Sequence, residues 1–213
     1  VAVALVFDYI NGFHDAANSV ATVVATRVLT PLQAVSWAAF FNFIAAFSFG
    51  TGVAHTVGAG LVDLNQVTPY VILGGLVGAI AWDLITWRLG LPTSSSHALM
   101  GGYAGASMAN VAFRKGMRHA GDAIIWSGWA KPMFFMVAAP LIGLALAYAF
   151  MIGVYWLFRG SSPKKMDVYF RKLQLLSAAV YSYSHGTNDA QKTMGIITGV
   201  LYVDNYLDTF KVP

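Results

Sequence analysis

The sequence lacks cysteine entirely and contains few charged residues. With no Cys among its 213 residues, disulfide bridges and thiolate metal sites are excluded. Charged residues make up only 10% of the chain, whereas soluble domains carry about a quarter. The net charge of +4 comes from basic residues concentrated in two connecting segments, 114–131 and 159–172. We therefore expect neither an ordinary soluble domain nor a nucleic-acid-binding protein.

Long stretches of the chain have no charge at all. Residues 28–62 and 132–158 contain no Asp, Glu, Lys or Arg. About 20 apolar residues in a helix span the hydrocarbon core of a bilayer. The sequence therefore predicts an all-α, polytopic protein that crosses a lipid bilayer several times. The helices that we expect cover residues 1–27, 33–57, 70–88, 132–158 and 172–203.

The ends and the orientation of the chain are less well defined. The two basic segments flank a single apolar run, 132–158, so the excess of positive charge on cytoplasmic loops predicts no orientation. The chain begins inside an apolar run without an initiator Met, and we expect it to be a fragment of a longer protein.

Residues 90–113 differ from the other apolar segments. The segment opens with Gly-Leu-Pro and a row of hydroxyls, and its apolar part, 97–113, is short for a full crossing. Such a segment is typical of a re-entrant hairpin or a broken helix, which lies at membrane depth only where it is buried or lines a cavity. Two connectors follow, a basic one at 114–131 and a basic loop at 159–171.

Polar residues recur along the first predicted helix with spacings of three and four. Such spacings place them on one helical stripe. These side chains could form hydrogen bonds with a neighbouring helix, or they could line an ion or substrate path. A carboxylate within the membrane costs at least about 2.5 kcal/mol, which favours the second interpretation for Asp15, whereas Asp8 lies nearer the helix end and could be solvated. The members are Asp8, Asn11, Asp15, Asn18 and Thr22.

Residues 185–194 echo residues 11–20. At a constant offset Asp15 meets Asp189 and Gly12 meets Gly186, while Lys192 takes the place of Asn18. The remaining polar positions differ: Asn11 falls on His185, and His14 on Asn188. Weak internal symmetry of this kind is typical of secondary transporters built from two structural repeats.

The stretch PTSSSH at 92–97 places four hydroxyls beside a histidine. One hydroxyl is enough to cap a helix start, and the free N–H groups at that start also attract oxyanions. Four in succession favour a binding site for an anion. The hydroxyls belong to Thr93, Ser94, Ser95 and Ser96, and the neighbouring histidine is His97.

Other polar residues have plainer interpretations. Asp83 and Arg88 lie toward one helix end and are predicted to form a structural pair or an interfacial anchor. Asn42 interrupts an apolar run, so we expect a buried polar contact there. His14 and His185, like His97, sit inside polar motifs and can titrate near neutral pH.

Three segments together resemble one protein family. INGFHDAANSVATVVATR, GLPTSSSHALMGG and SYSHGTNDAQKTMGI look like signature segments of the inorganic phosphate transporter (PiT) family, its bacterial low-affinity members above all. The resemblance implies an inverted-repeat symporter in the cell (inner or plasma) membrane. Its repeats would be 1–158, with a hairpin at 90–113, and a truncated 172–213, joined by the loop 159–171.

The resemblance also implies roles for individual residues. Phosphate would bind to Thr93, Ser94, Ser95, Ser96, Asn18 and Asn188. Coupling of a proton or sodium ion would involve Asp15, Asp189, Asn11, Asn42, His14, His97, His185 and Lys192. No cofactor beyond the coupling cation is implied, while a divalent metal accompanying the phosphate and a homodimer are further partners that the resemblance allows.

The sequence departs from the family pattern in two ways. A second P-x-S-x-x-H hairpin does not occur in these residues, so the site would be incomplete. Lys192 stands where many members have Asn, and Asn42 where many sodium-coupled relatives carry an acid. We take Lys192 and Asn42 to favour proton coupling over sodium coupling.

Three alternatives remain open at this point. The first is a permease for a related oxyanion such as sulfate. The second is a membrane-embedded metallohydrolase, which the internal echo disfavours because a hydrolytic site needs no symmetry. Its ligands would be His14, Asp15, His97, His185 and Asp189. The third, a purely structural membrane subunit, leaves the two costly carboxylates unexplained.

Overall fold

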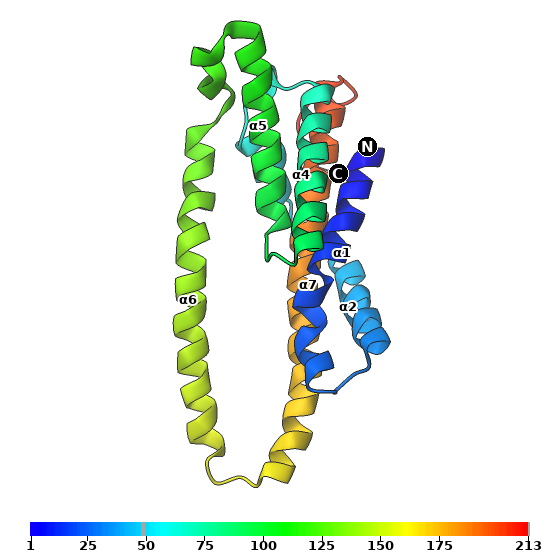
Figure 1. The fold of residues 1–213 in the computed structure, drawn as a ribbon, viewed down its shortest axis with the longest axis vertical. Helices are drawn as coiled ribbons and strands as arrows, with labels where there is room; N and C mark the ends of the chain where they lie inside the picture. The colour runs from blue at the N-terminus through cyan, green and yellow to red at the C-terminus, as the bar shows by residue number, and fades with distance from the viewer. Residues whose placement is uncertain (48–49, 213) are drawn as a thin grey trace.

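The computed structural model describes residues 1–47 and 50–212. Within these residues the chain is helical, and a single antiparallel bridge between Val62 and Ile124 is the only β pairing. Figure 1 shows the helices as an elongated bundle. In chain order they are α1 (Ala2–Ala25), α2 (Pro31–Ala45), α3 (Gly52–His55), a π-helical turn η1 (Thr56–Gly60), a 3₁₀ turn η2 (Leu64–Gln66), α4 (Pro69–Leu89), α5 (Ser95–Lys115), η3 (Met117–Ala123), α6 (Trp126–Phe158) and α7 (Pro163–Val203).

Capping residues in the sequence set several helix starts. Thr30 and Gln33 form a reciprocal capping box at the start of α2: the Thr30 hydroxyl accepts from the Gln33 amide, and the Gln33 side chain accepts from the Thr30 amide. Thr68 caps α4 through the amide of Val71, and Ser94 caps α5. The hydroxyl row of the sequence is therefore located at the N-terminus of a 21-residue helix.

Helices α4 and α5 form a tightly packed antiparallel pair. A Cβ atom at Gly102 would lie 2.5 Å from the carbonyl oxygen of Gly75, and one at Gly75 would lie 2.8 Å from the Cα of Tyr103. Only glycine permits so close an approach of two main chains. Tyr103, Leu76 and Leu99 are buried in the core beside this contact, which fixes the start of α5 against the end of α4.

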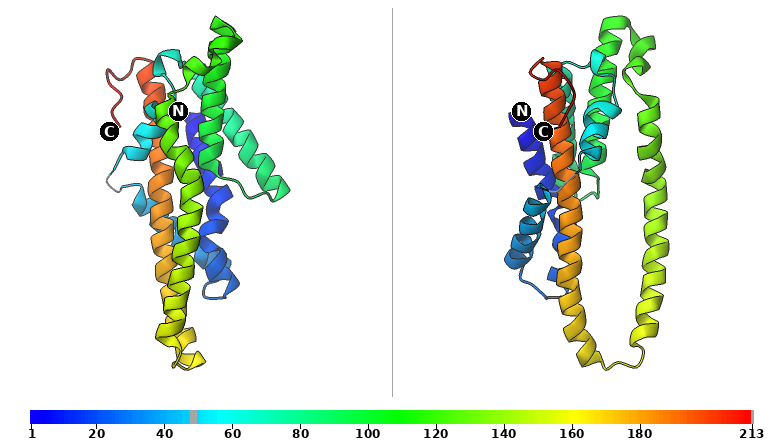
Figure 2. Two further views of the ribbon diagram at one scale, coloured as in Figure 1. Left: turned by 90° about the vertical axis from the view of Figure 1, so that its left-hand side faces the viewer. Right: turned by 180° about the vertical axis from the view of Figure 1, so that it is seen from behind.

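Helices α1 and α7 run antiparallel along each other, and both views agree on this (Figures 1 and 2). Near the start of α1, the Thr193 hydroxyl donates to Asp8 at 2.7 Å. Just past its end, the Thr26 hydroxyl donates to Gln174 at 2.8 Å. Residue numbers thus rise along α1 as they fall along α7. Helix α2 packs on both α7 and α1.

Helix α6 stands apart from the other helices (Figure 1). None of its 33 residues is buried, and it is held at its start, where the Trp129 indole N–H donates to the carbonyl of Leu61 at 3.1 Å. Among the described residues two helices are long and apolar enough to cross a bilayer, α4 with a mean hydropathy of 1.6 and α6 with 2.2. The class is all-α, as the sequence predicts.

The predicted helices 1–27 and 70–88 correspond closely to α1 and α4, but a continuous helix over 33–57 is wrong. Helix α2 ends at Ala45, and α3 begins only at Gly52. Gly50 has a φ of +127°, a conformation that excludes helix and favours glycine. Residues 48–49 of the predicted helix lie outside the described residues.

Two further predicted segments differ from the structure. The loop predicted at 159–171 is shorter, because α7 already begins at Pro163, a residue suited to the first position of a helix. In the predicted hairpin 90–113, residues from Ser95 onward form one unbroken helix, and the other arm of the helical pair is α4. Re-entrance into the membrane stays a prediction.

Candidate functional site

The buried face of α1 carries the polar residues at the centre of the molecule. Asn11, Asp15 and Ser19 are buried and follow one another by four positions. Asn18 and Thr22 are exposed. The predicted stripe is therefore correct for Asn11 and Asp15, while Ser19 rather than Asn18 continues it.

Ser95, the first residue of α5, connects that helix to α1. Its hydroxyl donates to Asp15 Oδ2 at 2.9 Å and also contacts Asn11 Oδ1. Ser95 is 1% exposed, and Asn11 is equally buried. Ser95 is the first residue of α5 because Ser94 is the N-cap, its hydroxyl accepting from the amide of His97.

His14 occupies the space between α1 and α4. Its Nδ1 lies 3.1 Å from Asp15 Oδ1, and its Nε2 lies 3.3 Å from the Thr86 hydroxyl. Thr86 is buried and bonds back to the main chain of its own helix. His14 is thereby held at both ring nitrogens.

His185 of α7 bridges the two echoed carboxylates. Its Nδ1 lies 2.9 Å from Asp189 Oδ2, and its Nε2 lies 3.7 Å from Asp15 Oδ2. The aspartates that the sequence pairs by its internal echo thus meet the same imidazole. This juxtaposition follows from the antiparallel packing of α1 on α7.

Lys192 extends the network to the second serine of α5. Its ammonium donates to Asp189 Oδ1 at 2.8 Å and to Ser96 Oγ at 2.9 Å. The residue is only 3% exposed, and a lysine so deeply buried is almost always paired. A continuous polar network therefore runs from α1 through the start of α5 to α7.

The four hydroxyls of the PTSSSH stretch have different partners. Thr93 accepts from the indole N–H of Trp82 at 3.2 Å, and Ser94 caps its helix. Ser95 and Ser96 bond to α1 and α7 as described above. The stretch therefore lies at the junction of α1, α4, α5 and α7.

Besides Thr93 and Ser94, four predicted residues lie outside this network. Asn18 and His97 are exposed. Asn188 is also exposed and donates to the carbonyl of Ser184 on its own helix. Asn42 donates to the carbonyl of Ala38, and its main chain lies against Gly186, where a Cβ atom would come within 2.6 Å of the Asn42 Cα.

Sequence reasoning missed Thr86 and assigned Asp83 to a different role. Asp83 is 0% exposed and forms no ion pair with Arg88 among the described residues, so the predicted pair is wrong. Asp83 and Thr86 both belong to the buried face of α4, which also contains Gly75 and Ala79. The helical spacing of these small and polar residues is a signal that could have revealed the face.

The arrangement of histidines and aspartates is that of ion pairs. Among residues 1–47 and 50–212 no group of three or more His, Asp or Glu side chains is arranged to hold a metal ion. The proposed hydrolase ligands His14, Asp15, His185 and Asp189 instead bond to one another and to hydroxyls. This geometry does not support the metallohydrolase interpretation.

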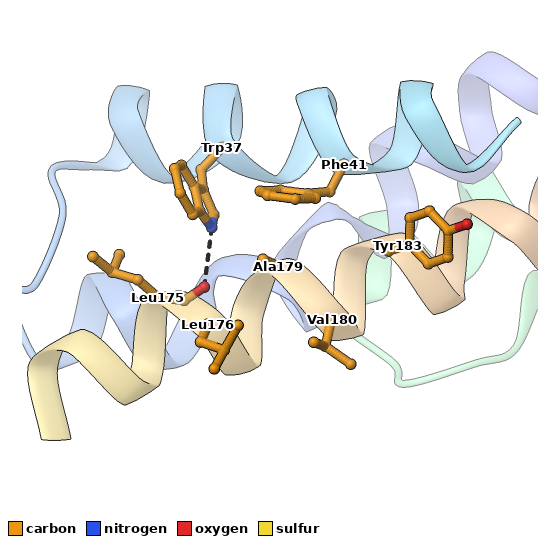
Figure 3. A pocket seen from close by; sticks show the side chains of 7 residues that line it. All are labelled: Trp37, Phe41, Leu175, Leu176, Ala179, Val180 and Tyr183. Carbon is orange, nitrogen blue, oxygen red and sulfur yellow. Dashed lines mark hydrogen bonds between the residues drawn. The ribbon is translucent and has the colours of Figure 1, made fainter. Parts of the chain in front are cut away.

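A groove between α2 and α7 has a different character (Figure 3). The Trp37 indole N–H donates to the Leu175 carbonyl at 3.1 Å inside it, and the other lining side chains are almost all apolar. Such a surface suits hydrocarbon and not a phosphate ion. The lining residues are Trp37, Phe41, Leu175, Leu176, Ala179, Val180 and Tyr183.

Known proteins are similar to this chain in sequence and in fold. It is 51% identical over 214 residues to a probable low-affinity inorganic phosphate transporter of Rhizobium meliloti (strain 1021), an alignment that covers 100% of the chain and 62% of the relative. It is 44% identical over 207 residues to a protein of the same name from Bacillus subtilis (strain 168), covering 96% of the chain and 60% of the relative. The chain thus spans about 60% of the length of these curated relatives.

A solved structure, "The sodium-dependent phosphate transporter", is similar in fold, with a TM-score of 0.75, 22% identity, and coverage of 100% of this chain and 70% of that one. The model of the family described as "Phosphate transporter family" matches residues 11–212. Those residues include the whole of α7 and α1 from Asn11 onward, together with the polar network between them. The chain therefore belongs to the phosphate transporter family.

Proposed function

We propose that the protein containing this chain imports inorganic phosphate through the cell membrane by cation symport, with protons favoured over sodium. The observation that carries the proposal is the network in which His185 joins Asp15 to Asp189. Ser95 ties Asp15 to the start of α5 directly, and Ser96 ties Asp189 to it through Lys192. Such a network connects the start of α5, where we expect phosphate to bind, with carboxylates that can bind a coupling cation.

The packing of α1 on α7 supports an inverted repeat. The echoed motifs lie on helices that run in opposite directions and meet near the middle of each motif. A two-fold axis in the membrane plane relates elements in this way. We propose that 1–158 forms one repeat and that 172–213 begins the second.

The start of α5 supports the assignment of the phosphate site. A helix of 21 residues presents free N–H groups and a positive dipole end there, and the Lys192 ammonium lies beside Ser96. We assign phosphate to Thr93, Ser94 and Ser96, with Ser95 positioning Asp15. In the full-length protein Asn18 and Asn188 would complete the shell, and a neutral metal–phosphate complex is a second form of the cargo.

Lys192 supports proton coupling. Its ammonium fills the space between Asp189 and Ser96, where a monovalent metal ion would otherwise find oxygen ligands. Sodium coupling is the second candidate, favoured by the name of the similar solved structure, "The sodium-dependent phosphate transporter". A sulfate permease is the nearest alternative for the substrate.

The test is phosphate uptake by the full-length protein in proteoliposomes. With sodium absent and the outside more acidic, radiolabelled phosphate should accumulate, and Asp15→Asn should abolish the accumulation. Asp122→Asn is the matched control, because this acid lies on the surface beside His119. Uptake that requires sodium and ignores the pH gradient would contradict proton coupling, and uptake of sulfate alone would contradict the substrate.

A further inference from the structure

Asp83 is a buried acid without any bonding partner. It is 0% exposed on the buried face of α4, and neither carboxylate oxygen has a hydrogen-bond partner among the described residues. A charged carboxylate in such a position would cost several kcal/mol. The structure thus calls for a species that neutralises this group.

The charged groups facing Asp83 come from two of the helices packed around it. His14 and Asp15 of α1 and Lys192 of α7 interact with it electrostatically. No charged side chain of α5 is among these partners within the described residues. Asp83 therefore lies within electrostatic range of the polar network without a hydrogen bond to it.

The other two carboxylates are already satisfied as anions. Asp15 is contacted by Ser95, His14 and His185, and Asp189 by His185 and Lys192. Donors of this number favour the charged form of a carboxyl group, whereas burial without donors favours the neutral form. Of Asp15, Asp83 and Asp189, Asp83 is the one whose surroundings favour a proton.

A metal cation would be poorly held at Asp83. Such ions require several oxygen ligands, and the nearby hydroxyl of Thr86 is turned toward the main-chain carbonyls of residues 82 and 83. A proton needs only one carboxylate oxygen and no cavity.

We propose that Asp83 carries the proton that is transported inward together with phosphate. The inference rests on the proposed function and deepens it. Asp83 takes a proton from the outer solution when the site opens outward, is buried in its neutral form as α1 and α4 close, and releases the proton when the site opens inward. Asp15, Asp189 and Lys192 remain ion-paired and hold the site together.

Infrared spectroscopy of the full-length protein tests the protonation directly. At neutral pH the carbonyl stretch of a protonated carboxyl should be present in the wild type and in Asp122→Asn but absent in Asp83→Asn. If Asp83→Asn does not fold, Asp83→Glu decides the question, since it keeps the carboxyl group and shifts its band. A wild-type protein that lacks this band, or a band that survives Asp83→Asn, would overturn the inference.

A transport measurement tests the role in coupling. A gradient of about one pH unit drives about a tenfold accumulation of phosphate for each coupled proton. Asp83→Asn should lose this tenfold, pH-driven accumulation of phosphate. It should still exchange labelled for unlabelled phosphate at equal pH on both sides. Full pH-driven accumulation in Asp83→Asn overturns the inference. A wild type that moves no phosphate contradicts the proposed function instead, and the infrared band then still decides whether Asp83 holds a proton.

Discussion

Single residues determine the charge of the polar network, and Lys192 contributes a positive charge to it. Its ammonium is the only lysine or arginine charge among the interactions of the network, and it touches both Asp189 and Ser96. A buried ion pair contributes little net stability, but removing one partner leaves the other charge exposed to an apolar interior. The consequence of losing Lys192 therefore depends on what can replace it.

Lys192→Asn restores in the second motif the residue that the first motif has at Asn18. We expect the variant to lose about 3 kcal/mol of stability in sodium-free buffer, because Asp189 keeps only His185. Sodium should restore part of that loss and should become necessary for phosphate uptake. Thermal unfolding and uptake, each with and without sodium, measure both effects. Lys172→Asn, an exposed position on the same helix, is the control; equal behaviour of the two variants would refute the assignment.

At this scale the sequence predicts the acids better than their partners. Asp15 and Asp189 could be singled out because a carboxylate in an apolar helix is costly wherever it lies. The bridging role of His185 and the burial of Thr86 depend on which helix faces which. A helical stripe defines a face only to within about one residue, so Asn18 and Ser19 exchanged places between the predicted and the observed stripe.

At the scale of elements, the start of α5 is positioned by the contact of its glycine face with α4. Gly75 and Gly102 lie at the crossing, and the main chains approach closely there. Any side chain at either position would separate the helices and displace Ser95 and Ser96. The geometry of the site thus depends on a contact two turns away from it.

The glycines of α4 allow a matched comparison. Gly75→Ala should destabilise the protein by about 1–3 kcal/mol, because its new methyl group would meet the main chain of Tyr103. Gly78→Ala, one turn further along the same helix, meets nothing within 4 Å and should leave stability unchanged or raise it by about 0.5–1 kcal/mol. Thermal unfolding in detergent distinguishes the two. Equal effects would show that the close crossing does not hold the pair together.

Element existence could be predicted more reliably than element limits. Long uncharged runs predict helices because the main chain must satisfy its own hydrogen bonds in lipid. The break after α2 depends on the positive φ of Gly50, and a glycine by itself does not reveal its φ. The polarity of residues 163–171 predicts a loop, whereas α7 already begins at Pro163. A helix with one end at the surface can carry polar residues, and Arg171 pairs there with Asp167 four residues earlier.

At the scale of the whole molecule, the antiparallel packing of α1 on α7 brings the two halves of the sequence echo together. The contacts of Asp8 with Thr193 and of Thr26 with Gln174 define the direction. The echo predicts that two copies of one motif exist, but it contains no information on their relative direction. Only the fold supplies that direction, and inverted repeats are one of the arrangements found in secondary transporters.

Cysteine cross-linking tests this arrangement, because the chain has no native Cys to interfere. Thr26→Cys with Gln174→Cys should be joined by a short, cleavable thiol reagent, since these side chains bond directly. Thr26→Cys with Ile197→Cys should not, because Ile197 would approach Thr26 only if the helices ran parallel. If the repeats move against each other during transport, the first cross-link should also stop phosphate uptake, and its cleavage should restore it. Efficient cross-linking of the second pair would contradict the antiparallel fold, whereas undiminished uptake by the cross-linked protein would place the moving contact elsewhere than between α1 and α7.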